Sequence, residues 1–473
     1  MSHEIEWAPR LRFVGPRGAP RVRGERAGQV LEALAVTPRL DVVSAWRLLA
    51  FAEYDVQRSF FEQVEQVPLG CTVVPNDDGT LRVERPLVRP SSLRDPAVVA
   101  AEIRRLLRAS VEESVASARR VAVLLSGGLD SGVVAAAARV VWGSLGRDPA
   151  DLAAFHGAPP PEAGPGERER AEIVARHLGL PLRVHTARAL ADPFAGCDDM
   201  LRLNDLPSDD GGFLHARDRL TAIRDAGFDT VLTGDGGDEV FGDWWVRPWR
   251  RSSPVRTGLA LAEFVARAAV RPVRDAIVGR RVALERKAGV LGTPAWLLAQ
   301  APAEPHAIGY APPPKGLHGA RAERWGRAYA ARQRVLLSWW RAWGECLGLT
   351  IRCPLLSLPV VGFVASLNPG LFRTSPVDRA LLRRAAAGDL PAEALQWPKQ
   401  VPEAMGHLRR DVRDHGSAWM EAHVQGTVLE RVGLAPRREW ADVVARGSTG
   451  HPMETFRALA LPSLGAWCRA RGV

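Results

Sequence analysis

The clearest hydrophobic pattern in the chain follows Asp95. Apolar residues recur there every three or four positions, which predicts an amphipathic helix that ends near residue 120: Val99, Ile103, Leu106, Leu107, Val111 and Val115. Asp95 and Pro96 precede the run and suit the N-cap and the first helical position. Residues 121–125 are apolar without alternation, which predicts a strand buried on both faces.

Similar apolar runs then alternate with helical patterns along the chain. They predict strands at residues 121–125, 152–156, 182–185 and 229–233, with helices at about 132–141 and 167–178. Because strands that alternate with helices form βαβ units, we expect a parallel sheet covered by helices on both faces.

The two ends of the chain differ from this middle part. Residues 1–90 hold strand-like runs at 71–74 and 81–83 on either side of Asn76–Gly79, a sequence that favours a hairpin turn. Beyond the last predicted strand, strand signals end and helical patterns dominate. A Pro- and Gly-rich stretch at 301–319 interrupts them and is expected to be an ordered loop or a mobile lid.

The composition excludes several classes of protein. The 473 residues are 46% hydrophobic and 25% charged, which argues against wholesale disorder. No apolar run is long enough to span a membrane, and the first residues do not resemble a signal peptide, so no membrane partner is expected. The five cysteines are scattered and never form a Cys-x-x-Cys pair, which argues against a disulfide framework and favours a reducing, cytoplasmic location.

The net charge of +10 comes almost entirely from arginine. Only three of the 63 basic residues are lysine, namely Lys287, Lys315 and Lys399. A nucleic-acid-binding surface should concentrate basic residues, whereas these arginines are spread along the chain without a basic tail. We therefore attribute them to GC-rich codon usage and expect no nucleic-acid partner. A lysine at a position of chemical interest stands out in such a chain.

The segment Ser126–Ser131, Ser-Gly-Gly-Leu-Asp-Ser, lies between a predicted strand and a predicted helix. Its glycines allow the backbone to approach a polyphosphate closely, and the following helix N-terminus supplies N–H donors. Asp130 could hold a magnesium ion that bridges the phosphates. Neither a Walker A loop nor a dinucleotide-binding fingerprint is present. A simple structural Gly-Gly turn would explain the glycines but not the whole segment.

A second polar segment follows the strand predicted at 229–233. It reads Thr-Gly-Asp-Gly-Gly-Asp-Glu-Val-Phe-Gly-Asp from Thr233 to Asp243. Open α/β sheets bind ligands at the carboxyl ends of their strands, so both segments are expected at one edge of the sheet. A solvated acidic turn would explain single carboxylates here, but not the complete run at a strand end.

Four segments resemble the class B asparagine synthetase and β-lactam synthetase family. Ser126–Ser131 resembles the PP-loop (SGGxDS) of ATP pyrophosphatases, and Thr233–Asp243 resembles the Gly-Glu-Gly-Ser/Ala-Asp-Glu-Leu-Phe-Gly-Gly signature of that family. Residues 348–357 are similar to its Gly-x-Glu-x-Arg-x-Pro-Phe-Leu-Asp motif, with Arg352 kept. Residues 390–400 are similar to Leu-Pro-x-x-(Ile/Val)-x-x-Arg-x-Lys-Gln, with Trp397 in place of the arginine.

The resemblance implies a role for each matching residue. ATP would be bound by Leu125, Ser126, Gly127, Gly128, Leu129, Asp130, Ser131, His156, Thr233 and Gly234. Asp130 and Asp238 would share Mg²⁺. The catalytic set would be Lys399, Asp235 and Arg352, with Lys399 directed at ATP and Asp235 at the position of the acid/base glutamate.

The resemblance also implies a fold class and a domain division. The fold would be α/β, with a parallel-sheet PP-loop (adenine nucleotide α-hydrolase-like) synthetase domain over residues 93–473. Its sheet core would span about 93–245 and its C-terminal helical lobe about 246–473. Residues 1–92 would be a small, truncated glutaminase-like β-containing remnant. It would lack the catalytic cysteine, because Ser2 stands where the family has that nucleophile.

The family chemistry implies an ATP-dependent synthetase that adenylates a carboxylate and forms an amide. Without a glutaminase, the amine would come from the same substrate, and a lactam ring would close. Residues 279–282 and 292–297 are similar to an Arg-rich helix and a Pro-x-Trp-Leu segment of lasso-peptide macrocyclases. We therefore favour a peptide substrate, with a leader peptidase and a leader-binding protein as implied partners.

Several alternatives stay open at this point. A β-lactam synthetase or a glutamine-independent asparagine synthetase would use the same ATP chemistry on a small amino-acid-derived substrate. A tRNA-modifying PP-loop enzyme usually carries paired cysteines or an RNA-binding module, and neither is seen. Tryptophans form two clusters, at residues 244–249 and 339–343; the second has helical spacing and favours a core position, whereas the first is as easily part of a pocket.

Overall fold

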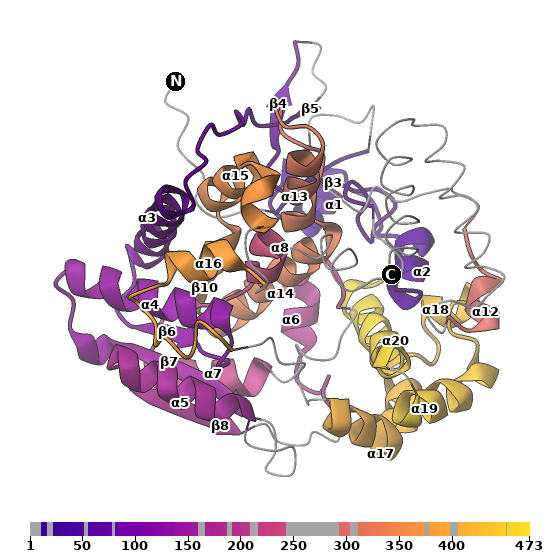
Figure 1. Cartoon of the computed structure of the whole chain (residues 1–473). Helices are drawn as coiled ribbons and strands as arrows, with labels where there is room; N and C mark the ends of the chain where they lie inside the picture. The colour runs from indigo at the N-terminus through magenta and orange to yellow at the C-terminus, as the bar shows by residue number, and fades with distance from the viewer. Residues whose placement is uncertain are drawn as a thin grey trace, which may run out of the picture.

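The computed structural model describes residues 11–16, 22–51, 55–77, 81–158, 166–186, 192–208, 216–242, 293–302, 311–373, 378–397, 405–450 and 452–473. Within these residues, five strands form a parallel sheet with strand order β10-β9-β6-β7-β8 (Figure 1). The strands are β6 (Val121–Leu124), β7 (Leu152–Ala158), β8 (Leu182–Thr186), β9 (Thr230–Leu232) and β10 (Thr350–Arg352). The predicted α/β class with a parallel sheet is therefore confirmed.

The central strand β6 explains why the sheet forms here. All four of its residues are buried, as the unbroken apolar run predicts. Strand order reverses at β6, because β7 lies on one side and β9 on the other. Such a reversal opens a crevice at the carboxyl ends of the strands, where α/β proteins bind ligands.

Helices cover the sheet and connect its strands. They are α3 (Pro96–Val115), α4 (Leu129–Ser144), α5 (Gly166–Leu178), α6 (Asp198–Leu203), α7 (Ala216–Asp225) and α8 (Gly237–Phe241). Asp95 caps α3 by accepting a hydrogen bond from the Ala97 N–H, and Pro96 occupies the first turn, as predicted. Helix α4 begins three residues earlier than predicted, so Asp130 and Ser131 lie in its first turn.

Within the described residues, the part of the chain after α8 is mainly helical. Its helices are α12 (Ala295–Leu298), α13 (Ala320–Ala328), α14 (Ala331–Leu347), α15 (Leu358–Ser366), α16 (Ala380–Ala385), α17 (Met405–His423), α18 (Val428–Arg431), α19 (Trp440–Thr449) and α20 (Pro452–Arg471). The expectation that strands end before this part is wrong at one place, since β10 pairs in parallel with β9. Three residues are too short a run to show strand periodicity.

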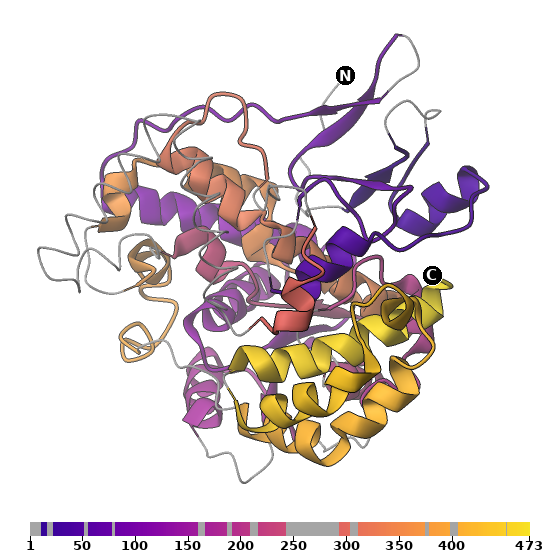
Figure 2. The ribbon, with the colours of Figure 1, turned by 90° about the vertical axis from the view of Figure 1, so that its right-hand side faces the viewer.

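The N-terminal elements pack beside the C-terminal helices (Figure 2). Strands β1 (Arg12–Val14), β2 (Arg23–Gly24) and β3 (Glu65–Val67) form a small antiparallel sheet next to helices α1 (Ala27–Ala33) and α2 (Val42–Leu49). The predicted hairpin is confirmed as β4 (Thr72–Pro75) and β5 (Leu81–Glu84). Helix α20 contacts both α2 and α6, which joins the two ends of the chain. None of the helices in the described residues is long and apolar enough to cross a membrane.

Candidate active site

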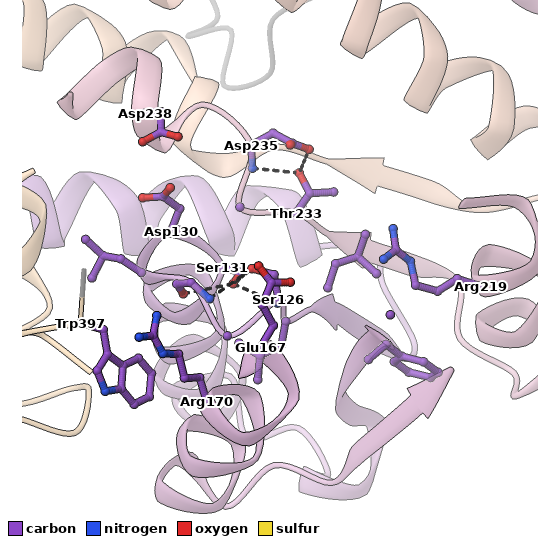
Figure 3. Close-up of a pocket in the computed structure, with 18 of the residues that line it drawn as sticks. Ser126, Asp130, Ser131, Glu167, Arg170, Arg219, Thr233, Asp235, Asp238 and Trp397 are labelled. Atoms are coloured by element: carbon purple, nitrogen blue, oxygen red, sulfur yellow. Dashed lines mark hydrogen bonds between the residues drawn. The ribbon is translucent and has the colours of Figure 1, made fainter. Parts of the chain in front are cut away.

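A cavity of about 390 Å³ lies at the carboxyl ends of β6, β7 and β9 (Figure 3). Both polar segments singled out from the sequence open into it. Residues in and next to the two polar segments form much of its lining: Leu124, Leu125, Ser126, Gly127, Gly128, Leu129, Asp130, Ser131, Thr233, Gly234, Asp235 and Asp238. The other lining residues are Phe155, Gly157, Glu167, Arg170, Arg219, Trp340, Arg379 and Trp397.

Hydrogen bonds between two serines hold the loop that follows β6. The Ser131 hydroxyl lies 3.1 Å from the backbone N of Ser126, from which it accepts a hydrogen bond, and 3.0 Å from the Ser126 hydroxyl. The Gly128 N–H in turn donates to the Ser126 hydroxyl at 3.2 Å. The loop is therefore fixed before a ligand arrives, with the N-terminus of α4 facing the cavity. Such an N-terminus is a ready-made site for phosphate.

Gly127 is required where this loop meets α5. Its φ of +88° is a backbone conformation that side chains with a Cβ rarely adopt. A Cβ at this position would also collide with the backbone oxygen of Glu167 and lie 3.0 Å from the Cβ of Arg170. The first turn of α5 is thus packed directly onto the loop.

Two carboxylates from different loops converge at one end of the cavity. Figure 3 shows Asp130, from the first turn of α4, and Asp238, from α8, directed toward each other. The buried guanidinium of Arg379 bridges them, since its Nη1 lies 2.5 Å from Asp130 Oδ2 and 3.2 Å from Asp238 Oδ1. Gly237 makes this approach possible, because a Cβ there would overlap the Asp130 carboxyl group.

This arrangement fits a magnesium ion bound together with nucleotide phosphates. Mg²⁺ usually binds such sites through one or two carboxylates, with phosphate oxygens and water completing its shell. The contacts of Arg379 show that Asp130 and Asp238 can face one cation at the same time. Among the described residues, no group of three or more His, Cys, Asp or Glu side chains could hold a metal without such phosphates.

Asp235 lies in the same cavity, and its carboxyl group is held by two donors. The Thr233 hydroxyl donates to Oδ2 at 2.7 Å, and the Trp340 indole N–H donates to the same oxygen at 2.9 Å. Burial raises the pKa of Asp235, while the two hydrogen bonds and the charge of Arg219 partly oppose that rise. A carboxyl group with a raised pKa, held in place and facing a cavity, suits proton transfer.

The structure brings most of the predicted site residues together. Every predicted residue from Leu125 to Ser131 lines the cavity, as do Thr233, Gly234, Asp235 and Asp238. His156 does not line it. Its side chain is buried, and its Nδ1 lies 2.8 Å from the Leu125 carbonyl oxygen. Residues that alternate along β7 face opposite sides, so Phe155 and Gly157 face the cavity instead.

Arg352 is also placed outside the lining. Its side chain is exposed at the end of β10, and its backbone oxygen accepts a hydrogen bond from the Thr233 N–H at 3.0 Å. Through this backbone hydrogen bond, Arg352 helps to position the polar segment that begins at Thr233. Lys399, the tryptophans at 244–249 and residues 279–282 lie outside the described residues. Trp296 is half-buried in α12 and does not line this cavity.

Sequence reasoning missed several side chains that line the cavity, among them Arg170, Arg219, Trp340 and Arg379. Each of these four comes from a helix or helix end without a motif of its own. Trp340 is largely buried against Trp339, so its predicted core position is confirmed, but its indole N–H also serves the site. The arginines could have been suspected only from the need for cations near phosphates.

Comparison with known proteins adds an independent finding. The family model described as asparagine synthase matches residues 102–425, which is more than half of the chain. The matched range contains both polar loops, all five strands of the parallel sheet and the helices that complete the cavity. The comparison with curated proteins found no match.

Proposed function

Since the chain belongs to the asparagine synthase family, whose members are ATP-dependent amide-forming ligases, we propose that it closes a lactam ring in a peptide. The reaction has two steps. A side-chain carboxylate of Asp or Glu attacks the α-phosphorus of ATP, and the bond to the β-phosphate breaks to release pyrophosphate. The N-terminal amine of the peptide then attacks the acyl-adenylate, loses a proton and displaces AMP.

One observation supports the first step above all. The Arg379 guanidinium contacts both Asp130 and Asp238 beside the loop that follows β6, so the two carboxylates can bind one cation together. A magnesium ion held by these carboxylates would neutralise charge on the β- and γ-phosphates. The N–H groups at the start of α4 would bind phosphate oxygens, and the glycines leave room for the nucleotide to approach.

Asp235 is suited to the second step. A carboxylate near the acyl group can take the proton that the attacking amine must lose. Thr233 and Trp340 both donate to Oδ2, which fixes the orientation of the carboxyl group relative to the cavity. Arg219 faces the same region and favours the ionised form of Asp235, the form that accepts a proton.

The peptide substrate is supported by sequence similarity. Residues 279–282 and 292–297 are similar to segments of lasso-peptide macrocyclases, and an aspartate at position 235 differs from the tyrosine typical of β-lactam synthetases. A leader peptidase that frees the N-terminal amine and a leader-binding protein are the partners that such a substrate needs.

Substrate-dependent ATP–pyrophosphate exchange tests this proposal. Three substrates are compared with Mg²⁺ and ATP: a peptide with a free N-terminal amine and an internal Asp or Glu, aspartate with ammonia, and a β-amino acid. We expect exchange with the peptide alone, AMP as the nucleotide product, and a peptide lighter by one water molecule in mass spectrometry. Exchange with only a small substrate would refute the peptide assignment, and ADP formation would refute the adenylation mechanism.

The role of Asp235 predicts a pH dependence of ring closure. A general base must be ionised, so the rate should rise with pH through the pKa of Asp235. Trp340→Phe removes a hydrogen bond that lowers this pKa. The acidic limb of the pH–rate profile for product formation should therefore move to higher pH.

Trp343→Phe is the matched control, because Trp343 is buried in the same helix and packs on Trp339. Its acidic limb should coincide with that of the unmodified enzyme. ATP–pyrophosphate exchange, which precedes the proton transfer, should keep its pH profile in both variants. An equal shift of the limb in the two variants would remove Trp340 from the mechanism.

A further inference from the structure

Arg170 and Trp397 form a cation–π pair in the wall of the cavity. Arg170 lies in α5, and its guanidinium carbon is 5.0 Å from the centre of the Trp397 ring. Both side chains line the cavity, and Figure 3 shows them side by side next to the loop that carries Ser126 and Asp130. Two segments far apart in the sequence thus meet at the phosphate-binding loop.

The packing of α5 brings Arg170 close to that loop. The Cβ of Arg170 lies 3.0 Å from where a Cβ on Gly127 would be, so the arginine side chain starts beside the loop backbone. Gly127 has no side chain to separate them. The Arg170 side chain therefore lies beside the loop at the N-terminus of α4 and lines the same cavity.

A cation–π contact with an indole suits a guanidinium that also binds phosphate. Such a contact uses the positive charge of the guanidinium and occupies none of its N–H donors with an acceptor atom. In-plane N–H donors match the spacing of two phosphate oxygens and bind them in a bidentate manner. The indole thus holds the guanidinium in place without using the donors that an anion needs.

We propose that Arg170 binds the β- and γ-phosphates of ATP and stabilises the departing pyrophosphate, and that Trp397 is the positioning residue that holds it. This role rests on the proposed function. When the bond between the α-phosphorus and the bridging oxygen breaks, the electron pair passes to pyrophosphate, and a cation beside that group lowers the barrier. The resembling family motif has an arginine at the position of Trp397. The proposed cation comes from Arg170 in α5, and Trp397 supports it.

Binding of inorganic pyrophosphate and of AMP, measured by calorimetry with Mg²⁺, tests the proposal directly. Arg170→Gln should weaken pyrophosphate binding by about 10- to 100-fold, as expected for loss of a charged hydrogen bond, and leave AMP binding unchanged. Trp397→Ala should weaken pyrophosphate binding by less, and Trp397→Phe should preserve most of it, because phenylalanine keeps an aromatic face.

Arg168→Gln is the control on the same helix. The Arg168 side chain is exposed and pairs with Glu172, with Nε 2.8 Å from Oε1. Its removal should change neither affinity. Unchanged pyrophosphate binding in Arg170→Gln, an equal loss of AMP binding, or no pyrophosphate binding by the unmodified protein would overturn the proposal. This measurement uses no peptide. Its result therefore tests the role of Arg170 even if the peptide-substrate proposal is wrong.

Discussion

Replacing Asp130 or Asp238 with asparagine is expected to abolish substrate-dependent ATP–pyrophosphate exchange. Asparagine has nearly the same shape but no negative charge, so the site would lose a ligand for the cation that neutralises the phosphates. Metal stabilisation of a transition state amounts to several kcal/mol, which corresponds to a loss of about three orders of magnitude in rate.

The measurement is exchange of labelled pyrophosphate into ATP at saturating substrate. Asp225→Asn serves as the matched control, since Asp225 is exposed at the end of α7 and pairs only with the neighbouring Arg224 in the described contacts. It should keep full activity. If either site variant retained more than a tenth of the normal exchange, the two carboxylates would not share the proposed ion.

Removing the charge of Arg379 should have the second-largest effect, and here the effect is on stability. The Arg379 side chain is only 4% exposed and contacts both Asp130 and Asp238. Arg379→Met would leave two half-buried carboxylates facing each other without the guanidinium. Removing one partner of a fully buried ion pair costs about 3–5 kcal/mol, and the partial exposure of these carboxylates places the expected cost at or below the lower end of that range.

Thermal unfolding in the presence of ATP, with and without Mg²⁺, measures this effect. The variant should unfold at a lower temperature, and Mg²⁺ should raise its Tm more than that of the unmodified protein, because the ion can replace the lost guanidinium between the carboxylates. Arg384→Met, on the exposed side of the same helix, should leave Tm unchanged. A Tm of Arg379→Met that is low but insensitive to Mg²⁺ would show that the carboxylates do not form a metal site.

The parts of the site that could be predicted are those built from contiguous residues. The loop Ser126–Ser131 is recognisable because glycines, hydroxyls and a carboxylate must follow one another directly between a strand and a helix. The parallel sheet was equally predictable, since buried strands such as Val121–Leu124 are apolar at every position.

The unpredicted parts depend on contacts between distant segments. Arg379 reaches the carboxylates from the residue before α16, where its φ of +58° is unusual for a residue with a side chain. Trp340 has the same helical spacing as its buried neighbours, so nothing local marks it as a partner of Asp235. His156 does not line the cavity, because the pleat of β7 decides which residues face it, and these are Phe155 and Gly157.

Strand β10 has a consequence for the way the chain matures on the ribosome. The edge of β9 is covered by Thr350–Arg352, and the cavity is completed by Trp340, Arg379 and Trp397. A nascent chain that ends before these residues already carries Asp130 and Asp238, yet exposes an unpaired strand edge of the kind that promotes aggregation. The protein therefore acquires its nucleotide pocket only late in translation, and a fragment that stops after α8 should not be a usable enzyme.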